Sequence, residues 1–447
     1  SNWAHEKLIY RFSLLVCMIF YIRGNPCSES IKSCIPSEDG MQLVCHKGIT
    51  DPYTNGSKVV KYLLLCNWPD VDFDPHSVLK NFPVLEEISI LYGPITKINS
   101  SFKAGMMLRK IVMNHLLMKN IPSGTFAGLQ HINTLDLRYN KLEFIDESVI
   151  PFIPNVKVFL TGNEWKCNSD IGWILSPNVK ETIIDLSSLS CSNYDRKPLF
   201  LIMQILKNLW DQCPTICTCI MDHVAWSYPV NVSLIPFHTV NCSYRGLTEF
   251  PSQIPSNTTT LFLQGNKIKS LEPLATNQLF YQLNDVYLDN NNIKSLNALE
   301  GSNWIFTFRI LSLRHNFISE IPTYALDNAF GKNVNLARVL LGHNPWQCDC
   351  TFVLSFQQLI TKHHNIFVDK NDIRCISDDG SSILMIENEA RATFCKEPII
   401  KFHMLTALDI LNITLASLIV LILGKLLYDY LIFKKSGKLP WVVMKIF

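Results

Sequence analysis

The second half of the chain repeats one pattern, in which apolar residues are followed by an asparagine. Apolar residues occupy positions 1, 4 and 6 of a short segment, and asparagine occupies position 9. The asparagines are spaced by 25, 25 and 28 residues (Asn266, Asn291, Asn316 and Asn344). The alternation predicts a short strand with one face in a core, and the asparagine can bond the backbone where the strand ends. Since one unit cannot bury its apolar face alone, the chain must stack its units into a solenoid.

An earlier stretch shows the same pattern less regularly. Its units begin 23, 24 and 23 residues apart (Leu85, Leu108, Ile132 and Asn155). Position 9 holds asparagine in the last two units, but glycine and leucine in the first two (Asn140 and Asn163; Gly93 and Leu116). The spacing is typical of leucine-rich repeats. We therefore predict an α/β leucine-rich repeat solenoid with tandem arrays at 82–164 and 257–343.

Cysteines lie where the ends of a solenoid need covers. We predict a first C-terminal cap at 165–212, a second N-terminal cap at 213–256 and a second C-terminal cap at 344–396. Cys167 has Ser169 in place of a second cysteine, so we expect a single Cys167–Cys191 bridge in the first C-terminal cap. The other cysteines expected in cap disulfides are Cys213, Cys217, Cys219, Cys242, Cys348, Cys350, Cys375 and Cys395.

The N-terminal region, 25–81, is predicted to be a further cysteine-containing cap. The pairing of its cysteines stays open (Cys27, Cys34, Cys45 and Cys66). For the four cysteines of the last cap, spacing alone permits three connectivities. The 15 cysteines of the chain favour an oxidising, extracellular compartment. Zinc is the alternative use of such spacings in a cytosolic protein.

The chain carries an apolar segment near each end. Lys7 and Arg11 precede an apolar stretch at 12–22, which predicts a signal peptide over 1–24, with a retained signal anchor as the alternative. The apolar run at 404–424 is long enough to cross a bilayer. Because basic residues follow it, we expect 425–447 to be cytoplasmic, which gives a single-pass type I protein of the cell membrane with an extracellular ectodomain. A frame of 410–433 is the alternative, and would bury Lys425 and Asp429 as an i,i+4 pair.

Several functions find no support in the sequence. The net charge of +2 gives no general reason to bind nucleic acid. No phosphate loop, HExxH motif or GxSxG motif is present, so we expect neither an enzyme nor a bound cofactor or metal. Five Asn-x-Ser/Thr sequons lie in the predicted ectodomain and are candidate glycosylation sites (Asn55, Asn99, Asn231, Asn241 and Asn257). A sixth, at Asn412, falls in the predicted span and should not be modified.

The non-core strand positions of a solenoid form its default binding face, because they present side chains in a row. In the second array the candidates for a ligand face are Phe262, Tyr287, Ser312 and Arg314. The alternative is that they are ordinary solvated sheet residues. A ligand could equally use the convex side, the caps or the N-terminal region.

The order of these segments resembles the ectodomain of insect Toll-type receptors. The resemblance covers 82–395 and is most specific over 213–350, where a Cys-Pro-x-x-Cys-x-Cys segment restarts the repeats and Asn-Pro-Trp-x-Cys-Asp-Cys closes them. It implies binding of protein ligands and, in the last cap, pairing of Cys348 with Cys375 and of Cys350 with Cys395. Residues 425–447 are too few for a TIR domain, so we expect no signalling through one in this chain. The chain is also similar to insect TIR-less repeat proteins of the halfway and singed wings type, which implies a link to the ecdysone developmental cascade.

Three functional hypotheses follow. The first is a receptor or co-receptor that binds an extracellular protein ligand or a partner receptor, alone or as a homo- or heterodimer. The second is an adhesion or decoy protein whose role ends at binding. The third is a secreted product from which the span has been removed.

Overall fold

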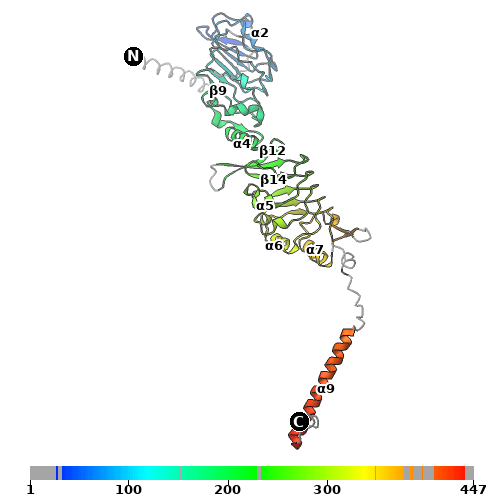
Figure 1. Ribbon diagram of the computed structural model, residues 1–447. Coiled ribbons are helices and arrows are strands. Elements are labelled where there is room, and N and C mark those ends of the chain that lie inside the picture. The colour runs from blue at the N-terminus through cyan, green and yellow to red at the C-terminus, as the bar shows by residue number, and fades with distance from the viewer. Residues whose placement is uncertain are drawn as a thin grey trace.

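The structure is a computed structural model that describes residues 27–28, 33–103, 105–151, 153–228, 233–347, 349–376, 382–385, 395 and 407–437. Two sheets follow each other along the chain, and a long helix, α9, stands apart from both (Figure 1). The signal peptide predicted at 1–24 lies outside the described residues.

The first sheet contains seven described strands in the order β1-β2-β3-β5-β7-β8-β9. β1 and β2 form an antiparallel hairpin, and each later neighbour is parallel. The strands are β1 (Cys34–Pro36), β2 (Gln42–His46), β3 (Tyr62–Cys66), β5 (Glu87–Leu91), β7 (Lys110–Asn114), β8 (Thr134–Asp136) and β9 (Lys157–Phe159). This is the parallel ladder that stacked repeats require.

The parallel sheet reaches into the region predicted to be only a cap. Leu63 of β3 is in register with Ile88 of β5, so 60–68 is a repeat unit like those that follow it. Its position 9 holds Trp68 instead of asparagine, which hid the unit in the sequence. The array therefore begins before residue 82, and the predicted boundary there needs this correction.

The second sheet contains six described strands in sequential order, β12 to β17. β12 and β13 form an antiparallel hairpin, and the others add in parallel. The strands are β12 (Thr218–Trp226), β13 (Leu234–Asn241), β14 (Thr258–Phe262), β15 (Asp285–Tyr287), β16 (Ile310–Ser312) and β17 (Arg338–Leu340). Each sheet thus starts with a hairpin. Cys34–Cys45 joins the two strands of the first hairpin, and Cys217–Cys242 joins the residues that flank the open end of the second.

Short helices and small strands return the chain from one strand to the next. In the first array they are η1 (Tyr53–Asn55), β4 (Asp72–Phe73), α2 (Pro75–Leu79), β6 (Lys97–Ile98) and η2 (Glu147–Val149). In the second array they are α5 (Glu272–Thr276), η5 (Gln278–Phe280), η6 (Asn297–Leu299), η7 (Trp304–Phe306) and α6 (Thr323–Lys332). The apolar residues of these segments enter the same core as the strands, as Leu274, Leu299 and Leu326 do.

Each array ends in a helical cap. The first contains η3 (Ser169–Leu175), α3 (Val179–Thr182), η4 (Leu186–Ser188), β10 (Ser190–Cys191), β11 (Lys197–Pro198) and α4 (Leu199–Gln212). The second contains α7 (Cys350–Lys362), η8 (Lys370–Asp372), β18 (Arg374–Ile376) and β19 (Ser382–Leu384). One apolar face of α4 is buried in the first core, so α4 is a cap helix. Met221 and Val224 of β12 pack against that same core, which joins the two arrays.

Buried asparagines connect successive repeats under the end of each sheet. Asn291 donates its amide to the carbonyls of Leu263 and Leu288, and its Oδ1 accepts the N–H of Ile268. Asn140, Asn163, Asn266, Asn316 and Asn344 make equivalent contacts. Leu116 occupies the asparagine position of its own unit, and its N–H is bonded by Asn140 of the next unit. The ladder satisfies backbone groups that would otherwise be buried unpaired.

The residue before each asparagine has a left-handed backbone conformation. Tyr139 adopts this conformation with a φ of 56°, and Gly162 of the next repeat with a φ of 81°. A Cβ at Gly162 would overlap the Tyr139 ring, and a Cβ at Gly265 would overlap the ring of Tyr244 in the same way. Glycine is therefore needed at both positions, because the tyrosine of the preceding repeat lies flat across it.

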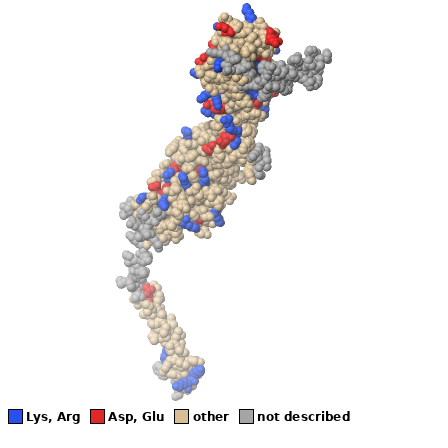
Figure 2. Space-filling model, turned by 180° about the vertical axis from the view of Figure 1, so that it is seen from behind, with Lys and Arg blue, Asp and Glu red and all other residues tan. Residues whose placement is uncertain are grey.

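α9 (Ala407–Ser436) packs in neither core. Residues Leu408–Ser436 are long and apolar enough to cross a membrane, with a mean hydropathy of 2.3 in their most apolar stretch. Figure 2 shows an acidic side chain near the N-terminal end of this helix and basic side chains gathered at its C-terminal end. The helix continues well beyond residue 424 and covers all of the 410–433 frame, whereas residues 404–406 of the 404–424 frame lie outside the described residues.

Candidate protein-binding face of the second array

The strands of the second array place the same positions of successive repeats side by side. Strand register aligns one row at position 5 (Asn241, Phe262, Tyr287, Ser312 and Leu340). A second row lies at position 3 (Thr260, Asp285, Ile310 and Arg338). We call the surface formed by positions 3, 5 and 7 of β13 to β17 the concave face, since it points away from the buried positions 4 and 6.

Two predicted ligand-face residues form an aromatic pair on the concave face. The rings of Phe262 and Tyr287 stack with their centroids 4.6 Å apart and their planes 15° from parallel. Both side chains are half-buried. Burial, and then the carboxylate of Asp285, raises the pKa of Tyr287. The pair is a flat, rigid apolar surface of the kind that binds side chains of other proteins.

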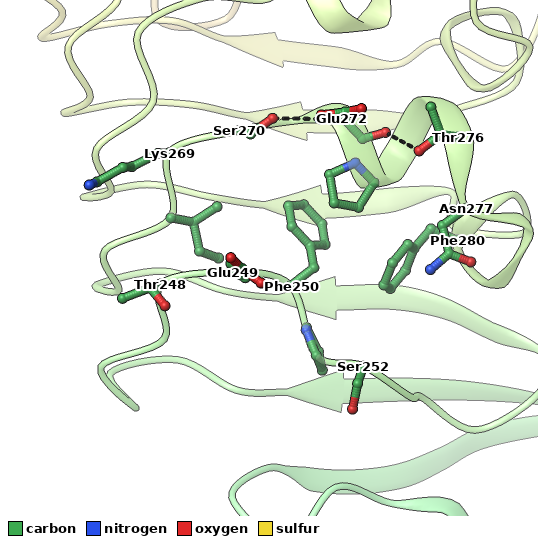
Figure 3. Close-up of a pocket in the computed structure, with 13 residues that line it drawn as sticks. Thr248, Glu249, Phe250, Ser252, Lys269, Ser270, Glu272, Thr276, Asn277 and Phe280 are labelled. Carbon is green, nitrogen blue, oxygen red and sulfur yellow. Dashed lines mark hydrogen bonds between the residues drawn. The ribbon is translucent and has the colours of Figure 1, made fainter.

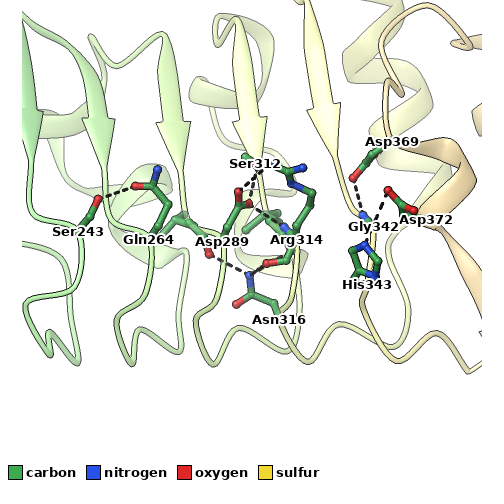
Figure 4. Close-up of polar contacts among 12 residues, drawn as sticks. Ser243, Gln264, Asp289, Ser312, Arg314, Asn316, Gly342, His343, Asp369 and Asp372 are labelled. Atoms are coloured by element: carbon green, nitrogen blue, oxygen red, sulfur yellow. Dashed lines mark hydrogen bonds and ion pairs between the residues drawn. The ribbon is translucent and has the colours of Figure 1, made fainter.

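Buried carboxylates flank Tyr287 on its own strand. The guanidinium of Arg309 donates to both carboxylate oxygens of Asp285, and the Nε–Oδ1 distance is 2.8 Å. This hydrogen bond raises the pKa of Arg309. Asp289 accepts the Ser312 hydroxyl at 2.5 Å and the Arg314 N–H at 2.9 Å, and its other oxygen lies 3.3 Å from the Arg314 guanidinium (Figure 4). The Arg309–Asp285 contact is bidentate, whereas the Arg314 guanidinium makes a single contact to Asp289, and both contacts cross from one repeat to the next.

The predicted residues differ in what they offer to a partner. Phe262, Tyr287 and Arg314 reach solvent, whereas Ser312 is only 1% exposed. Ser312 therefore lies beneath the candidate ligand face, where it holds Asp289, and its expected place among the contact residues needs this correction. It is buried because the hydroxyl turns along the sheet to the neighbouring strand.

Sequence reasoning missed Asp285, Asp289 and Arg338 on the same face, and Arg309 at position 2 beside it. Asp285 and Arg338 occupy position 3 of their repeats, and Asp289 occupies position 7. The repeat period alone would have placed them beside the predicted residues.

A third buried carboxylate, Asp369, lies at the far end of the face. Asp369 accepts the N–H of Gly342 at 2.7 Å, and burial raises the pKa of Asp369 (Figure 4). Asp185 does the same at the end of the first array, where it accepts the N–H groups of Leu160 and Thr161. In both caps an aspartate replaces the backbone acceptor that a further strand would have supplied.

A pocket of about 500 Å³ lies between the loop that leads into the array and α5. Phe250 and Phe280 meet edge-on at its base, and Glu249, Lys269 and Glu272 lie at its rim (Figure 3). Figure 3 shows the Lys269 side chain pointing away from the two phenylalanine rings. Among the described residues, no cluster of three or more histidine, cysteine or acidic side chains is placed to hold a metal ion.

The structure also locates the predicted cap disulfides and sequons. It contains the bridges Cys167–Cys191, Cys213–Cys219, Cys217–Cys242 and Cys350–Cys395, and pairs Cys27 with Cys66 and Cys34 with Cys45. Cys375 is disulfide-bonded, while Cys348 lies outside the described residues. Asn55, Asn99 and Asn241 are exposed and Asn257 is half-buried, so each can be reached from solvent; Asn231 lies outside the described residues.

Comparisons with known proteins give relatives over most of the chain. The family model described as the Halfway C-terminal domain matches residues 408–445. Protein singed wings 2 of Drosophila melanogaster is 33% identical over 393 residues, which cover 86% of this chain and 78% of the relative. Protein halfway of Drosophila pseudoobscura pseudoobscura is 27% identical over 383 residues, which cover 81% of this chain and 61% of the relative. The chain thus spans less than two thirds of that halfway protein.

Among solved structures, the chain is similar to one in the Toll–Spatzle complex of Drosophila, with 15% identity and a TM-score of 0.37. That match covers 79% of this chain and 51% of the other. Human 5T4, a trophoblast glycoprotein, matches with 13% identity and a TM-score of 0.25, over 80% of this chain and 97% of the other.

Proposed function

From the premise that the chain belongs to the leucine-rich repeat family of the Drosophila proteins singed wings 2 and halfway, we propose that it is a cell-surface binding protein. In this proposal α9 anchors the chain in the membrane and the two arrays face the outside. The concave face of the second array binds an extracellular protein ligand or a partner receptor. The chain acts as a receptor or co-receptor without a TIR domain of its own, in an ecdysone-linked developmental pathway.

The observation that carries the proposal is the Phe262–Tyr287 aromatic pair together with the two Asp–Arg ion pairs that flank it. Phe262 and Tyr287 are half-exposed, and the flanking Asp285–Arg309 and Asp289–Arg314 pairs hold the surroundings in place. A solvated sheet needs neither a stacked aromatic pair nor buried carboxylates beneath its surface. A preorganised surface loses little conformational entropy on binding, which favours recognition of a partner.

Two engineered glycosylation sites, which we call glycan wedges because each places a bulky glycan on one face of the array, test the proposal. Arg338→Asn with Leu340→Thr creates a sequon on the concave face, and Lys332→Asn with Val334→Thr creates one on the opposite side, where Val334 is 94% exposed. Full-length chains carrying each wedge would be expressed on cells that face the native extracellular proteins. Partners would then be captured by cell-surface crosslinking and identified by mass spectrometry.

We expect the concave wedge to remove the partners that the unmodified chain captures and the convex wedge to retain them, because a glycan blocks only the face that carries it. Mobility shifts on glycosidase treatment would verify that both wedges are glycosylated. Partners retained equally by both variants would contradict binding through this face.

A further inference from the structure

One cation on the concave face of the second array, Arg338, has no ion-pair partner among the described carboxylates of that face. Asp285 is paired with Arg309, and Asp289 with Arg314. Arg338 lies in the same row as Asp285, two strands further along. Its exposed guanidinium makes no ion pair or hydrogen bond within the described part of the chain. Among the described residues of this face, Arg338 is therefore the arginine without a carboxylate partner, and its strand position is set by β17.

Apolar side chains surround this charge. Leu340 follows Arg338 on the same side of β17, and Val368 lies beside Leu340 because Val339 bridges to Phe367. Val368 is 55% exposed. On the other side, Arg338 is close enough to Tyr287 for its charge to act on the phenol. The free cation thus lies between a small apolar patch and the Phe262–Tyr287 pair.

The number of free cations distinguishes between classes of anionic ligand. A sulfated glycan or another polyanion gains affinity by contacting several free cations at once. Here the guanidinium groups of Arg309 and Arg314 are already held by Asp285 and Asp289, and Asp285 is only 3% exposed. One remaining cation among apolar side chains suits one carboxylate on a largely apolar ligand.

We propose that the concave face binds an extended segment of a partner protein that places one Asp or Glu carboxylate on Arg338 and an aromatic or branched apolar side chain on the Phe262–Tyr287 pair. Arg338 and Tyr287 are two parallel strands apart and offset by two residues along the strands, which corresponds to about 12 Å between their Cα atoms. An extended chain covers that distance in about three residues. The recognised segment therefore has its acidic and apolar residues about three positions apart. This inference rests on the proposed function and specifies the chemistry of its ligand.

A peptide selection tests the proposal. A library of random peptides displayed on phage would be selected on the full-length chain, solubilised in detergent and immobilised through its C-terminal end. Enriched peptides would be synthesised with their acidic residue and with the matching amide. Each would be titrated against the unmodified chain, Arg338→Glu, Arg338→Gln and the control Lys332→Glu, which makes the same charge change on the opposite side of the array.

We expect enriched peptides to contain Asp or Glu about three residues from an aromatic or branched apolar residue. The dissociation constant should rise about tenfold on acid-to-amide change or with Arg338→Gln, more with Arg338→Glu, and by less than about twofold with Lys332→Glu. A raised salt concentration should weaken binding of the acidic peptides and not of their amides. An unchanged unfolding midpoint of both Arg338 variants would show that they remain folded.

Peptides without an acidic residue, peptides that bind Arg338→Glu normally, or no enrichment at all would overturn the proposal. So would a heparin oligosaccharide that competes fully with the selected peptides, because that outcome assigns the face to glycans. If the concave wedge displaces protein partners while these peptide results fail, the proposed function stands and only the acidic ligand is refuted. If the concave wedge displaces no partner, the proposed function fails independently of the peptides.

Discussion

Replacing Asn344 with alanine should destabilise the second array by about 3 kcal/mol. The Asn344 side chain is buried and accepts the N–H groups of Asn316 and Ile318 at 3.1 and 3.2 Å. It also donates to the carbonyls of Leu313 and Leu341 at 3.0 and 2.8 Å. Alanine would leave these backbone groups buried and unpaired, and each unpaired group costs about 1–3 kcal/mol before the structure relaxes.

Urea unfolding of the disulfide-intact full chain in detergent, followed by tryptophan fluorescence, would measure this loss. Asn297→Ala is the matched control, because Asn297 is exposed and its side chain makes no hydrogen bond within the described residues. The control should change stability by less than about 0.5 kcal/mol. Equal effects of the two substitutions would show that the asparagine ladder does not hold the repeats together.

Removal of the Cys167–Cys191 bridge should destabilise the first array by about 3 kcal/mol. The bridge joins residues 24 positions apart and both cysteines are buried in the first core. The first C-terminal cap has a single bridge because Ser169 occupies the position of a second cysteine. The double variant Cys167→Ala, Cys191→Ala therefore leaves this cap without any covalent link.

Hydrogen exchange of the backbone would localise the effect, with faster exchange in β8 and β9 and unchanged exchange in β15 and β16. The matched control is the double alanine variant of Cys213 and Cys219, which are only six positions apart. Because this disulfide closes a shorter loop, its removal should lower the free energy of unfolding by about 1 kcal/mol less than removal of Cys167–Cys191. An equal or larger loss in the control would contradict the account based on loop length.

The sequence predicted the stacked repeats because their period is carried by buried residues. Leu261, Leu263 and Asn266 are buried at set positions of their repeat, so the spacing between such residues is visible in the sequence. It did not reveal the unit at 60–68, because Trp68 stands where asparagine was sought. The indole of Trp68 donates to the carbonyl of Asp72, which is a local contact that no repeat pattern encodes.

The candidate site was predicted less completely than the fold. The aromatic residues Phe262 and Tyr287 were found from their strand positions, and the structure shows that they stack. The pairing of Asp285 with Arg309 depends on which residues neighbouring repeats bring together, 24 positions apart. Ser312 was expected on the surface, but the Asp289 carboxylate draws its hydroxyl into the sheet. Side-chain direction of this kind depends on neighbours in space and not on the period.

The C-terminal end of the membrane span could not be placed from hydropathy alone. The helix continues past Lys425, whose ammonium lies 2.5 Å from the carboxylate of Asp429 one turn later. An i,i+4 pair of opposite charge supports a helix locally, so these charges do not interrupt it. The apolar run favoured a span that ends at residue 424, with 410–433 as the alternative, and the helix extends past both of these ends.

The measurement that tests the central claim most directly is the topology of the full chain in intact cells. One epitope tag would follow Gly301, an exposed turn of the second array, and another would follow Gly437 at the end of α9. The account predicts that antibodies label the first tag on intact cells and the second only after permeabilisation, because basic residues at the end of α9 remain inside. Labelling of the second tag on intact cells, or of neither tag before permeabilisation, would contradict a membrane-anchored protein with its repeats outside.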